Sequence, residues 1–311
     1  MSDVVAVEGL RKSYGSVKAV AGVSFTVERG QIFALLGPNG AGKSTTLEIL
    51  EGFRARDGGR VEVLGLDPGD RAVARELRER IGLVLQDIAV EPYLTVRETI
   101  ARNAGYYRNP GDVDELIELV DLSGLERRKV RALSGGQKRR LDLALGMIGN
   151  PDLLFLDEPT TGFDPSARRS AWQIVRNLRE AGTTVVLTTH HMEEAQELAD
   201  RVAVISDGRI VSEGTPENLG GRDTSRVRIS FVPPAGSTAA DLPVDAISGK
   251  GARIVTETDE PTATLHRLTD WALRRGTVLD QLTVERPSLE DIYLDLTDRD
   301  APEPATRGNA L

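Results

Sequence analysis

Hydrophobic residues follow two different patterns along the chain as far as Gly220. Residues 4–7, 23–27 and 61–64 alternate apolar with polar positions, as half-exposed antiparallel strands do. Other segments are continuous apolar runs, which is typical of central parallel strands: 32–36, 153–156, 185–189 and 202–205. Because helix-compatible segments alternate with the strands, the pattern predicts an α/β fold with a mostly parallel sheet.

Local signals add a hairpin and a helical region to this unit. Asp207-Gly208 stands between two strand-like segments and predicts a two-residue hairpin turn. Between Asp87 and Asn150 the pattern is helical, most clearly at 113–120 and 141–148. We therefore expect a largely helical subdomain in the middle of the chain.

After residue 220 the pattern becomes that of a second, smaller α/β unit. Strands are predicted near 227–231 and 252–256, and a helix from about 262 to 275, which Gly276 would cap. The expected domains are 1–220, an accessory domain at 221–297 and a disordered tail at 298–311.

Ser288-Leu-Glu-Asp291 is the last local signal. A hydroxyl followed three residues later by a carboxylate forms a capping box, so an amphipathic helix is expected to begin here.

Composition narrows the classes of function. A chain of 311 residues suggests about two domains. Cysteine is absent, which excludes disulfides, thiolate nucleophiles and Cys-ligated metal sites. With 48 acidic against 39 basic residues the net charge is −9, so a nucleic-acid partner is not expected.

The chain also lacks signals for membrane insertion. No apolar stretch approaches the roughly 18–20 residues that a spanning helix needs. The first ten residues carry two acidic groups and no basic segment, so a secretory signal is not supported. We expect a cytoplasmic protein whose only contact with a membrane is made through a partner.

A phosphate-binding loop is the first chemical motif. Residues 37–44 fit the pattern GxxxxGK[ST], follow an apolar strand and precede a helix-compatible run. Glycines let backbone N–H groups surround phosphates at a helix N-terminus, and the lysine and hydroxyl serve the phosphates and Mg²⁺. The residues expected to bind nucleotide here are Gly37, Pro38, Asn39, Gly40, Ala41, Gly42, Lys43, Ser44 and Thr45.

Two adjacent carboxylates end the apolar run at 153–156. Asp157 and Glu158 stand at the carboxyl end of a predicted strand, where ligands bind in open α/β sheets. One carboxylate could hold Mg²⁺ through its water shell and the other could activate a water molecule. Alone, such a pair is also compatible with an ordinary strand end.

The order of further motifs resembles that of the ATP-binding-cassette (ABC) ATPases. Leu133-Ser-Gly-Gly-Gln137 resembles the signature motif of this family, and it precedes Asp157 along the chain. Tyr14 resembles the aromatic residue that stacks on adenine, and Gln86 the Q-loop glutamine. Gly162-Phe-Asp164 resembles the D-loop, and His190 the switch histidine. The likeness covers roughly residues 3–220.

This resemblance implies a fold and residue roles. The fold would be a P-loop ATPase cassette with an antiparallel β subdomain and a helical signature subdomain, followed by a small α/β C-terminal domain. Glu158 would be the general base, His190 would contact the γ-phosphate and Lys43 would bind phosphates. Ser44, Gln86 and Asp157 would surround Mg²⁺. For Tyr14 an ordinary surface aromatic is the alternative, and His191 and His266 are expected to be non-catalytic.

The resemblance also implies a homodimer of cassettes. In this family the signature of one cassette faces the γ-phosphate bound by the other, so two ATP molecules are buried between two chains. The residues expected to act across this interface are Ser134, Gly135, Gly136, Gln137 and Asp164.

The likeness extends to transport. A single cassette without a membrane segment implies separate transmembrane permease subunits, and the segment after Gln86 is where such a partner would dock. Tyr93 and Leu94 are candidate contacts, although a local core role explains them equally well. Residues 286–296, with the sequence RPSLEDIYLDL, resemble the end of daunorubicin-resistance-type multidrug exporters.

Cargo and some functional classes stay open. Drugs, lipids and polysaccharides are all compatible cargoes, and the C-terminal domain could regulate, stabilise a dimer or contact the permease. An importer ATPase is one alternative. A non-transport ABC ATPase is another, although such proteins carry tandem cassettes, coiled coils, zinc cysteines or basic patches.

Overall fold

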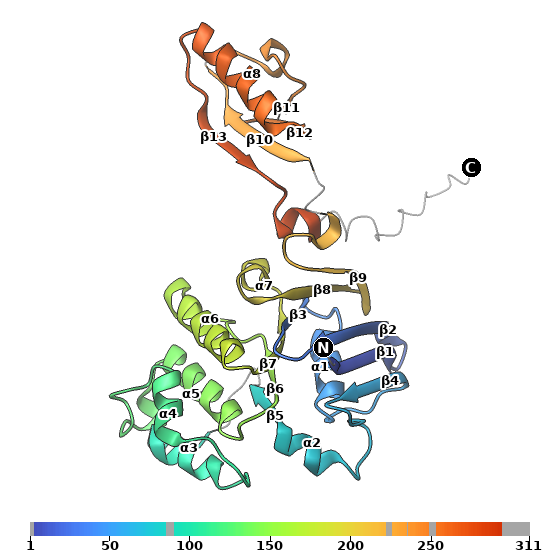
Figure 1. Ribbon diagram of the computed structural model, residues 1–311, viewed down its shortest axis with the longest axis vertical. Helices are drawn as coiled ribbons and strands as arrows, with labels where there is room; N and C mark the ends of the chain where they lie inside the picture. Colours follow the sequence, from blue (N-terminus) through green and yellow to red (C-terminus); the bar gives the residue numbers. More distant parts are fainter. Residues whose placement is uncertain (1–2, 85–89, 222–225, 235, 249–252, 294–311) are drawn as a thin grey trace, which may run out of the picture. The chain divides into compact units, whose positions relative to one another are not determined.

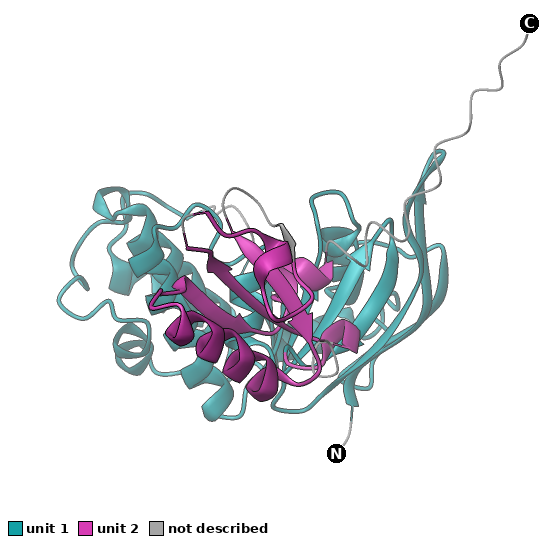
Figure 2. Cartoon of the chain, turned by 90° about the horizontal axis from the view of Figure 1, so that it is seen from above, with its two compact units in different colours: residues 1–216 teal, residues 217–311 magenta. Residues whose placement is uncertain are grey.

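The computed structural model describes residues 3–84, 90–221, 226–234, 236–248 and 253–293. The chain forms two compact units, residues 1–216 and 217–311 (Figures 1 and 2). The segment expected to be a tail, 298–311, lies outside the described residues. Among those described, no helix combines the length and apolarity needed to cross a membrane.

Strands and helices alternate through most of the larger unit, as the sequence pattern predicts. In chain order its elements are β1 (Asp3–Tyr14), β2 (Val17–Glu28), β3 (Ile32–Leu36), α1 (Lys43–Leu50), β4 (Gly58–Val63), α2 (Ala74–Arg80), β5 (Ile81–Val84), α3 (Val96–Ala104), α4 (Val113–Leu119), α5 (Gly135–Met147), β6 (Leu153–Asp157), α6 (Pro165–Glu180), β7 (Thr184–Thr189), α7 (Met192–Leu198), β8 (Arg201–Ser206) and β9 (Arg209–Gly214).

The central sheet has six strands in the order β5-β6-β7-β3-β8-β9. All neighbouring strands are parallel except β8 and β9, which form the hairpin predicted at Asp207-Gly208. Every residue of β3 and β7 is buried, which explains their continuous apolar or threonine composition. The predicted α/β architecture with a mostly parallel sheet is confirmed.

A second, antiparallel sheet has the order β2-β1-β4. The predicted strands at 4–7, 23–27 and 61–64 lie in it, but β1 and β2 each run for 12 residues. Their pairing shifts register at several points, for example between Val7 and Leu10, where Gly9 has a φ of 57°. Such bulges break the strict alternation of side chains, so the sequence pattern showed only part of each strand.

One core joins the two sheets of the larger unit. Helix α1 contacts β2 and β4 of the antiparallel sheet and β6 and β7 of the central sheet. The rings of Phe25 on β2 and Phe33 on β3 stack with centroids 4.9 Å apart. The loop before α1 is therefore anchored in rigid structure at both of its ends.

Strand β5 was not predicted from the hydrophobic pattern. It has four residues and contains Gly82, where an added Cβ would lie 2.1 Å from the carbonyl oxygen of Gly146 on α5. The glycine thus permits close packing of a helix on the strand, and it also interrupts the apolar run that would reveal the strand.

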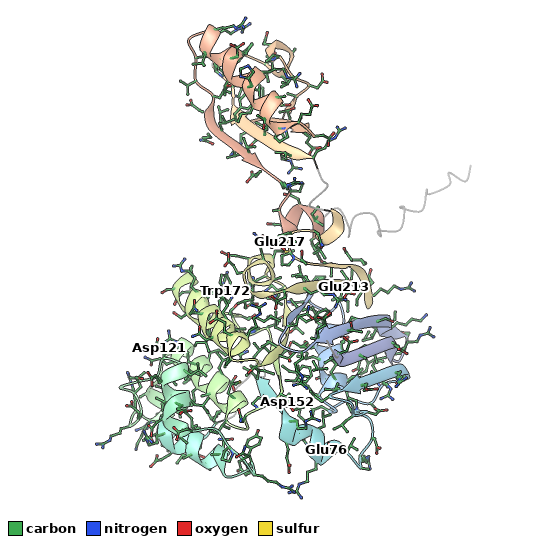
Figure 3. The ribbon with its side chains drawn as sticks, viewed as in Figure 1. Glu76, Asp121, Asp152, Trp172, Glu213 and Glu217 are labelled. Atoms are coloured by element: carbon green, nitrogen blue, oxygen red, sulfur yellow. The ribbon has the colours of Figure 1, made fainter. Side chains whose placement is uncertain are left out.

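The predicted helical subdomain is formed by α3, α4 and α5, which contact one another. Helix α6 lies nearby in sequence but packs on α7. Trp172 of α6, labelled in Figure 3, is buried, and its indole N–H donates to the Glu194 carboxylate at 3.1 Å.

The smaller unit is an antiparallel sheet with one long helix. The strand order is β11-β12-β10-β13, and the core includes Phe231 and Leu268. Its elements are β10 (Val227–Val232), β11 (Ile247–Ser248), β12 (Ile254–Thr258), α8 (Pro261–Arg274) and β13 (Asp280–Glu285).

Most local predictions for this unit are confirmed. Gly276 follows α8 with a φ of 63°, as a helix-ending glycine should. Ser288 and Asp291 form both hydrogen bonds of the predicted capping box. Strand β13 was missed because most of it is exposed and Gln281, with a φ of 52°, breaks its alternation.

A buried carboxyl group at the end of α1 yields a first prediction. Glu51 is 4% exposed. Burial, with smaller contributions from Asp157 and Glu48, raises its pKa from 4.5 to about 8. The folded protein therefore binds this proton more tightly than the unfolded chain, and stability is lost as the pH rises from 4.5 towards 8.

Glu51→Gln should therefore stabilise the protein increasingly as the pH rises. At about 1.4 kcal/mol per pH unit, the gain in free energy of unfolding reaches at most about 5 kcal/mol above pH 8 and is small near pH 5. Urea unfolding at pH 5.5 and 8.5 measures it, with Glu62→Gln on β4, a partly exposed position, as the control. An equal gain at both pH values would contradict the buried, protonated state.

Candidate functional site

The phosphate-binding loop, residues 37–42, connects β3 to α1. Gly40 and Gly42 have φ values of 85° and 103°, which favour glycine. A Cβ at Gly42 would lie 2.3 Å from the carbonyl oxygen of Ala19, and one at Gly208 would lie 2.9 Å from the same atom. Gly42 is therefore held against β2 and the β8–β9 turn with no room for a side chain at this position.

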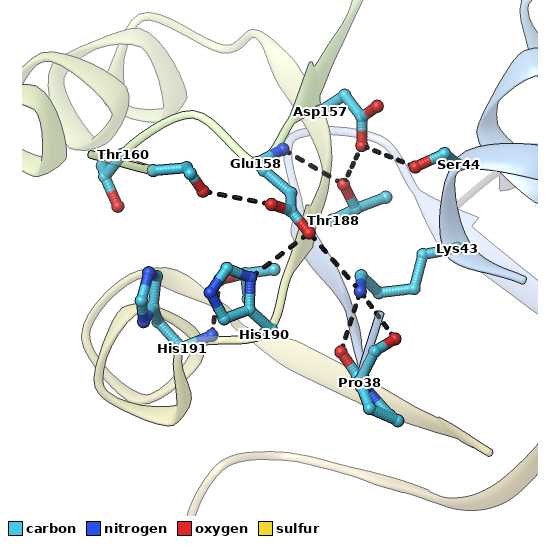
Figure 4. A network of polar contacts seen from close by, with 12 residues as sticks. Pro38, Lys43, Ser44, Asp157, Glu158, Thr160, Thr188, His190 and His191 are labelled. Atoms are coloured by element: carbon cyan, nitrogen blue, oxygen red, sulfur yellow. Dashed lines mark hydrogen bonds and ion pairs between the residues drawn. The ribbon is translucent and has the colours of Figure 1, made fainter. Parts of the chain in front are cut away.

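Lys43, the first residue of α1, lies over this loop. Its Nζ donates to the carbonyl oxygens of Gly37 at 2.8 Å and Pro38 at 3.0 Å (Figure 4). Burial lowers the pKa of the ammonium group, although Glu158 and Asp157 oppose the shift. A hollow of 340 Å³ lies here, lined by Ala19, Asn39, Gly40, Gly42, Lys43, Ser44, Thr45 and Glu158.

Asp157 ends β6 beside this hollow. Its Oδ1 accepts hydrogen bonds from Ser44 Oγ at 3.3 Å and from Thr188 Oγ1 (Figure 4). Thr188 is its neighbour in the pairing of β6 with β7. Ser44 and Asp157 thus present a hydroxyl and a carboxylate oxygen side by side, which is the type of ligand that Mg²⁺ prefers.

Glu158 follows with an unusual backbone conformation. Its φ of 46° places it in the left-handed region, at a cost of about 1–2 kcal/mol for a residue with a side chain. The backbone N–H donates to the carbonyl oxygen and to Oγ1 of Thr188, both at 3.1 Å. This turn directs the carboxylate to the phosphate-binding loop (Figure 4).

Three side chains contact the Glu158 carboxylate. Lys43 Nζ lies 3.5 Å and His190 Nδ1 3.2 Å from Oε1, and Thr161 Oγ1 donates to Oε2 at 3.1 Å. Burial alone would raise the pKa of Glu158, but the neighbouring His190, the hydrogen bond from Thr161 and the charge of Lys43 lower it below its usual value. The group is therefore ionised at neutral pH.

His190 follows the last residue of β7 and so reaches the same edge of the sheet. Its ring lies 4.0 Å from that of His191, centroid to centroid. Burial, with smaller contributions from the nearby His190 and Arg168, lowers the pKa of His191. The structure thus brings His190 to the Glu158 carboxylate, whereas His191 forms no ion pair with it.

The signature residues form a separate site at the N-terminus of α5. Ser134 caps this helix, with its Oγ accepting from Gln137 N at 3.3 Å and its N–H donating to Gln137 Oε1 at 3.0 Å. A hollow of 680 Å³ lies here, lined by Ser134, Gly135, Gly136, Gln137, Arg139, Arg140, Thr161, Gly162, Phe163, Asp164, Ser166, Ala167 and Ser170. None of the residues lining this hollow belongs to the phosphate-binding loop.

Asp164 and Tyr14 have local roles in the structure. Asp164 caps α6, accepting from the N–H groups of Ser166 at 2.8 Å and Ala167 at 2.9 Å. Tyr14, at the end of β1, is 41% exposed, and the cationic groups of Lys12 and Arg54 lie 5.7 and 5.3 Å from its ring centroid. Stacking on adenine stays a prediction for Tyr14.

Sequence and structure differ in which site residues they reveal. Gln86 lies outside the described residues, so its role also stays a prediction. Conversely, Thr188 and Thr161 contact the two carboxylates and were not singled out as site residues. The signal for Thr188 is a hydroxyl residue near the carboxyl end of a fully buried central strand.

Two protein-family models match the chain. The model described as "ABC transporter" matches residues 20–161. A second model, described as the C-terminal domain of "ABC transporter domain-containing protein-like", matches residues 227–288.

Curated relatives match over nearly the whole length. The chain is 38% identical over 309 residues to the daunorubicin resistance ATP-binding protein DrrA3 of Streptomyces coeruleorubidus, covering 95% of this chain and 96% of that protein. It is 39% identical over 311 residues to the Nod factor export ATP-binding protein I of Ralstonia nicotianae, covering 96% and 94%.

Solved structures match the cassette part. A dimeric post-hydrolysis structure of the ATP-binding cassette MJ0796, bound to ADP and Pi, has a TM-score of 0.61 and 26% identity, covering 68% of this chain and 98% of that one. The structure of cbiO1 from Clostridium perfringens has a TM-score of 0.65 and 28% identity, covering 70% and 90%. The chain therefore belongs to the ABC transporter family, as an ATPase of the branch that contains the daunorubicin-resistance and Nod factor export ATP-binding proteins.

Proposed function

We propose that this protein binds and hydrolyses Mg²⁺-ATP as a homodimer and thereby drives export through separate transmembrane subunits. The observation that carries the proposal is a cluster at one hollow, which Lys43, Ser44 and Glu158 line and which Asp157 and His190 join through Ser44 and Glu158, while the signature residues lie at another hollow. The export direction is supported by the names of the relatives, which concern drug resistance and Nod factor export.

Each side chain has a chemical task in this proposal. Lys43 and the N–H groups of the loop bind the β- and γ-phosphates at the N-terminus of α1. Ser44 and Asp157, with Gln86, hold Mg²⁺, which when bound neutralises charge on the phosphate oxygens. Their oxygens fit this ion, since Ser44 Oγ and Asp157 Oδ1 are 3.3 Å apart and both are hard ligands.

Glu158 is the group that activates water. Because its pKa is lowered, the carboxylate is ionised and free to accept a proton from the attacking water molecule. His190, which lies 3.2 Å from this carboxylate, would contact the γ-phosphate and keep the water and the base in line.

The separation of the two hollows supports a homodimer. A single chain places its phosphate-binding loop and its signature at different sites, so a second chain must supply the signature to each bound ATP. Solved cassettes that this chain resembles include dimers. The positive end of α5, with Ser134 and Gly136, would then face the γ-phosphate of the partner chain.

The names of the relatives concern daunorubicin resistance and Nod factor export, so drugs, lipids and polysaccharides all stay within the proposed export through a membrane partner. The protein itself would lie at the inner face of the cell membrane through that partner. The smaller unit, which matches a C-terminal domain of ABC transporter proteins, is proposed to serve this assembly.

Glu158→Gln tests the base. The amide keeps the shape of the side chain but cannot accept the proton, so kcat should fall by about 10²–10⁴-fold while ATP binding persists. Phosphate release and titration with a fluorescent ATP analogue measure the two quantities, with Glu62→Gln on β4 as the control. Full hydrolysis by the variant would remove Glu158 from this role.

Lys43→Ala tests phosphate binding. Loss of a charge-assisted contact worth about 1.5–3 kcal/mol should weaken ATP binding by roughly 10–150-fold. Lys18→Ala, at an exposed position of β2, removes the same charge away from the loop and should leave the affinity unchanged. An unaltered affinity in Lys43→Ala would argue against the assigned phosphate site.

The transport proposal predicts a membrane partner. Glu158→Gln protein with Mg²⁺ and ATP, used to capture partners from detergent-solubilised membranes, should retain a polytopic protein that has no cassette of its own. The same capture with Lys43→Ala should retain less of it, because this variant cannot bind ATP well. Recovery of soluble partners or nucleic acid alone would refute the export function and leave the ATPase assignment standing.

A further inference from the structure

A buried pair of charges in α5 has no place in the mechanism described so far. Arg139 and Asp142 lie one turn apart on this helix, with side chains 8% and 12% exposed. Burying two charges is costly, and replacing such a pair by apolar residues is often neutral for stability. Burial raises the pKa of Asp142 to about 6 even with Arg139 beside it. Stability alone is therefore a weak explanation for the pair.

The contacts of Arg139 point to the neighbouring strand end. Its Nη1 donates to Asp142 Oδ2 at 2.8 Å. Its Nε donates to the carbonyl oxygen of Pro159 at 3.0 Å, and its Nη2 to that of Asp157 at 3.2 Å. Because a guanidinium group is planar and rigid, these three bonds fix the two carbonyl groups relative to each other.

The two carbonyl groups lie on either side of Glu158. This residue has a left-handed backbone with a φ of 46°, and its N–H is held by Thr188 from the opposite direction. A strained conformation persists only where its surroundings over-determine it. Arg139 restrains this backbone through the carbonyl groups of Asp157 and Pro159. Thr188 restrains it through the N–H group of Glu158, as Figure 4 shows.

We infer that Arg139 is a positioning residue for the Glu158 carboxylate, and that Asp142 orients Arg139 for this task. The inference rests on the proposed role of Glu158 as general base. It has a specific consequence, because Arg139 belongs to the helix that begins at the signature motif. Arg139 acts on the carboxylate of its own chain, whereas Ser134 on the same helix serves the ATP of the partner chain.

Arg139→Gln tests the inference in the full-length chain. Since a displacement of about 1 Å in a reacting group can cost roughly 10²-fold, kcat should fall by about that factor. KM for ATP should stay within about twofold, because no phosphate contact is lost. Arg139→Lys keeps the charge but reaches fewer acceptors, so its kcat should lie between those of the wild type and Arg139→Gln.

Arg80→Gln is a matched control, because Arg80 acts at the beginning of β6 whereas Arg139 acts at its end. Arg80 likewise pairs with a carboxylate, Asp152 before β6, at 2.8 Å, and donates to a carbonyl oxygen, that of Leu64, at 3.2 Å. Asp152 is labelled in Figure 3. Removing this arginine costs similar contacts but leaves Glu158 in place, so kcat should stay at the wild-type value.

A second variant covers the case in which Arg139→Gln fails to fold. Arg139→Met combined with Asp142→Leu removes both charges and leaves neither one buried alone, so it should keep the melting temperature of the wild type. It lacks the bonds to the two carbonyl groups, so its kcat should fall as in Arg139→Gln. A wild-type kcat in this double variant would overturn the inference.

Mixed dimers separate positioning of the base from support of the signature. A small amount of chain with intact Glu158, the limiting chain, is mixed with a large excess of Glu158→Gln chain. Nearly every limiting chain then pairs with an excess chain, and each such dimer has one active site. That site uses the phosphate loop and Glu158 of the limiting chain and Ser134 of the excess chain. Arg139→Gln is then placed in either chain, and phosphate release is measured.

The expected result is a loss of about 10²-fold when Arg139→Gln is in the limiting chain, and a change within about twofold when it is in the excess chain. A loss that follows the excess chain would assign Arg139 to the signature and overturn the inference. No loss in either arrangement, with Glu158→Gln inactive, would overturn it and leave the proposed function intact. Full activity of Glu158→Gln alone would overturn both.

Discussion

The parallel pairing of β3, β6 and β7 is the constraint on which the rest of the site depends. In this register Leu36 pairs with Thr189 and Asp157 with Thr188, so three strands end at the same level. The loop after β3, the carboxylates at the end of β6 and the histidine after β7 therefore emerge side by side. Buried apolar residues hold these strands, and the polar residues follow directly where burial ends.

In the proposed homodimer, the same arrangement makes each chain half of two sites. The hollow beside Lys43 is lined by the carboxylate of Glu158 and the hydroxyl of Ser44, but no signature residue lines it. The hollow beside Ser134 has a capped helix N-terminus and the residues around Asp164. Within one chain the segment from Asp157 to Asp164 connects the two sites. Glu158 lines the first hollow, and residues 161–164 line the second.

Much of this could be predicted from the sequence. The strands that are buried on both faces and the motifs at their ends depend on local order, and the structure confirms the strands and the fold. Short or exposed strands such as β5 and β13 could not be predicted, because Gly82 and Gln281 break the patterns that reveal strands. The smaller unit was predicted in outline, since its helix α8 has a clear apolar face and a glycine at its end.

Contacts between distant residues were the least predictable. The left-handed backbone of Glu158 and the bonds from Arg139, which comes earlier in the chain, depend on how α5 packs against the end of β6. A sequence shows an arginine in a helix but not the carbonyl groups that it reaches. The roles assigned to Tyr14, Gln86 and Asp164 stay predictions, because they involve a nucleotide or a second chain.

The close approach at Ala19 has a consequence for how such a protein can evolve. One carbonyl oxygen of β2 lies where side chains at Gly42 and at Gly208 would have to be placed. Each glycine meets this atom independently, so replacing one does not relax the demand on the other. A side chain at either position would require β2 or the glycine's own backbone to move. The phosphate-binding loop, β2 and the β8–β9 turn are thus expected to change together in evolution, although Ala19 and Gly208 lie far apart in the sequence.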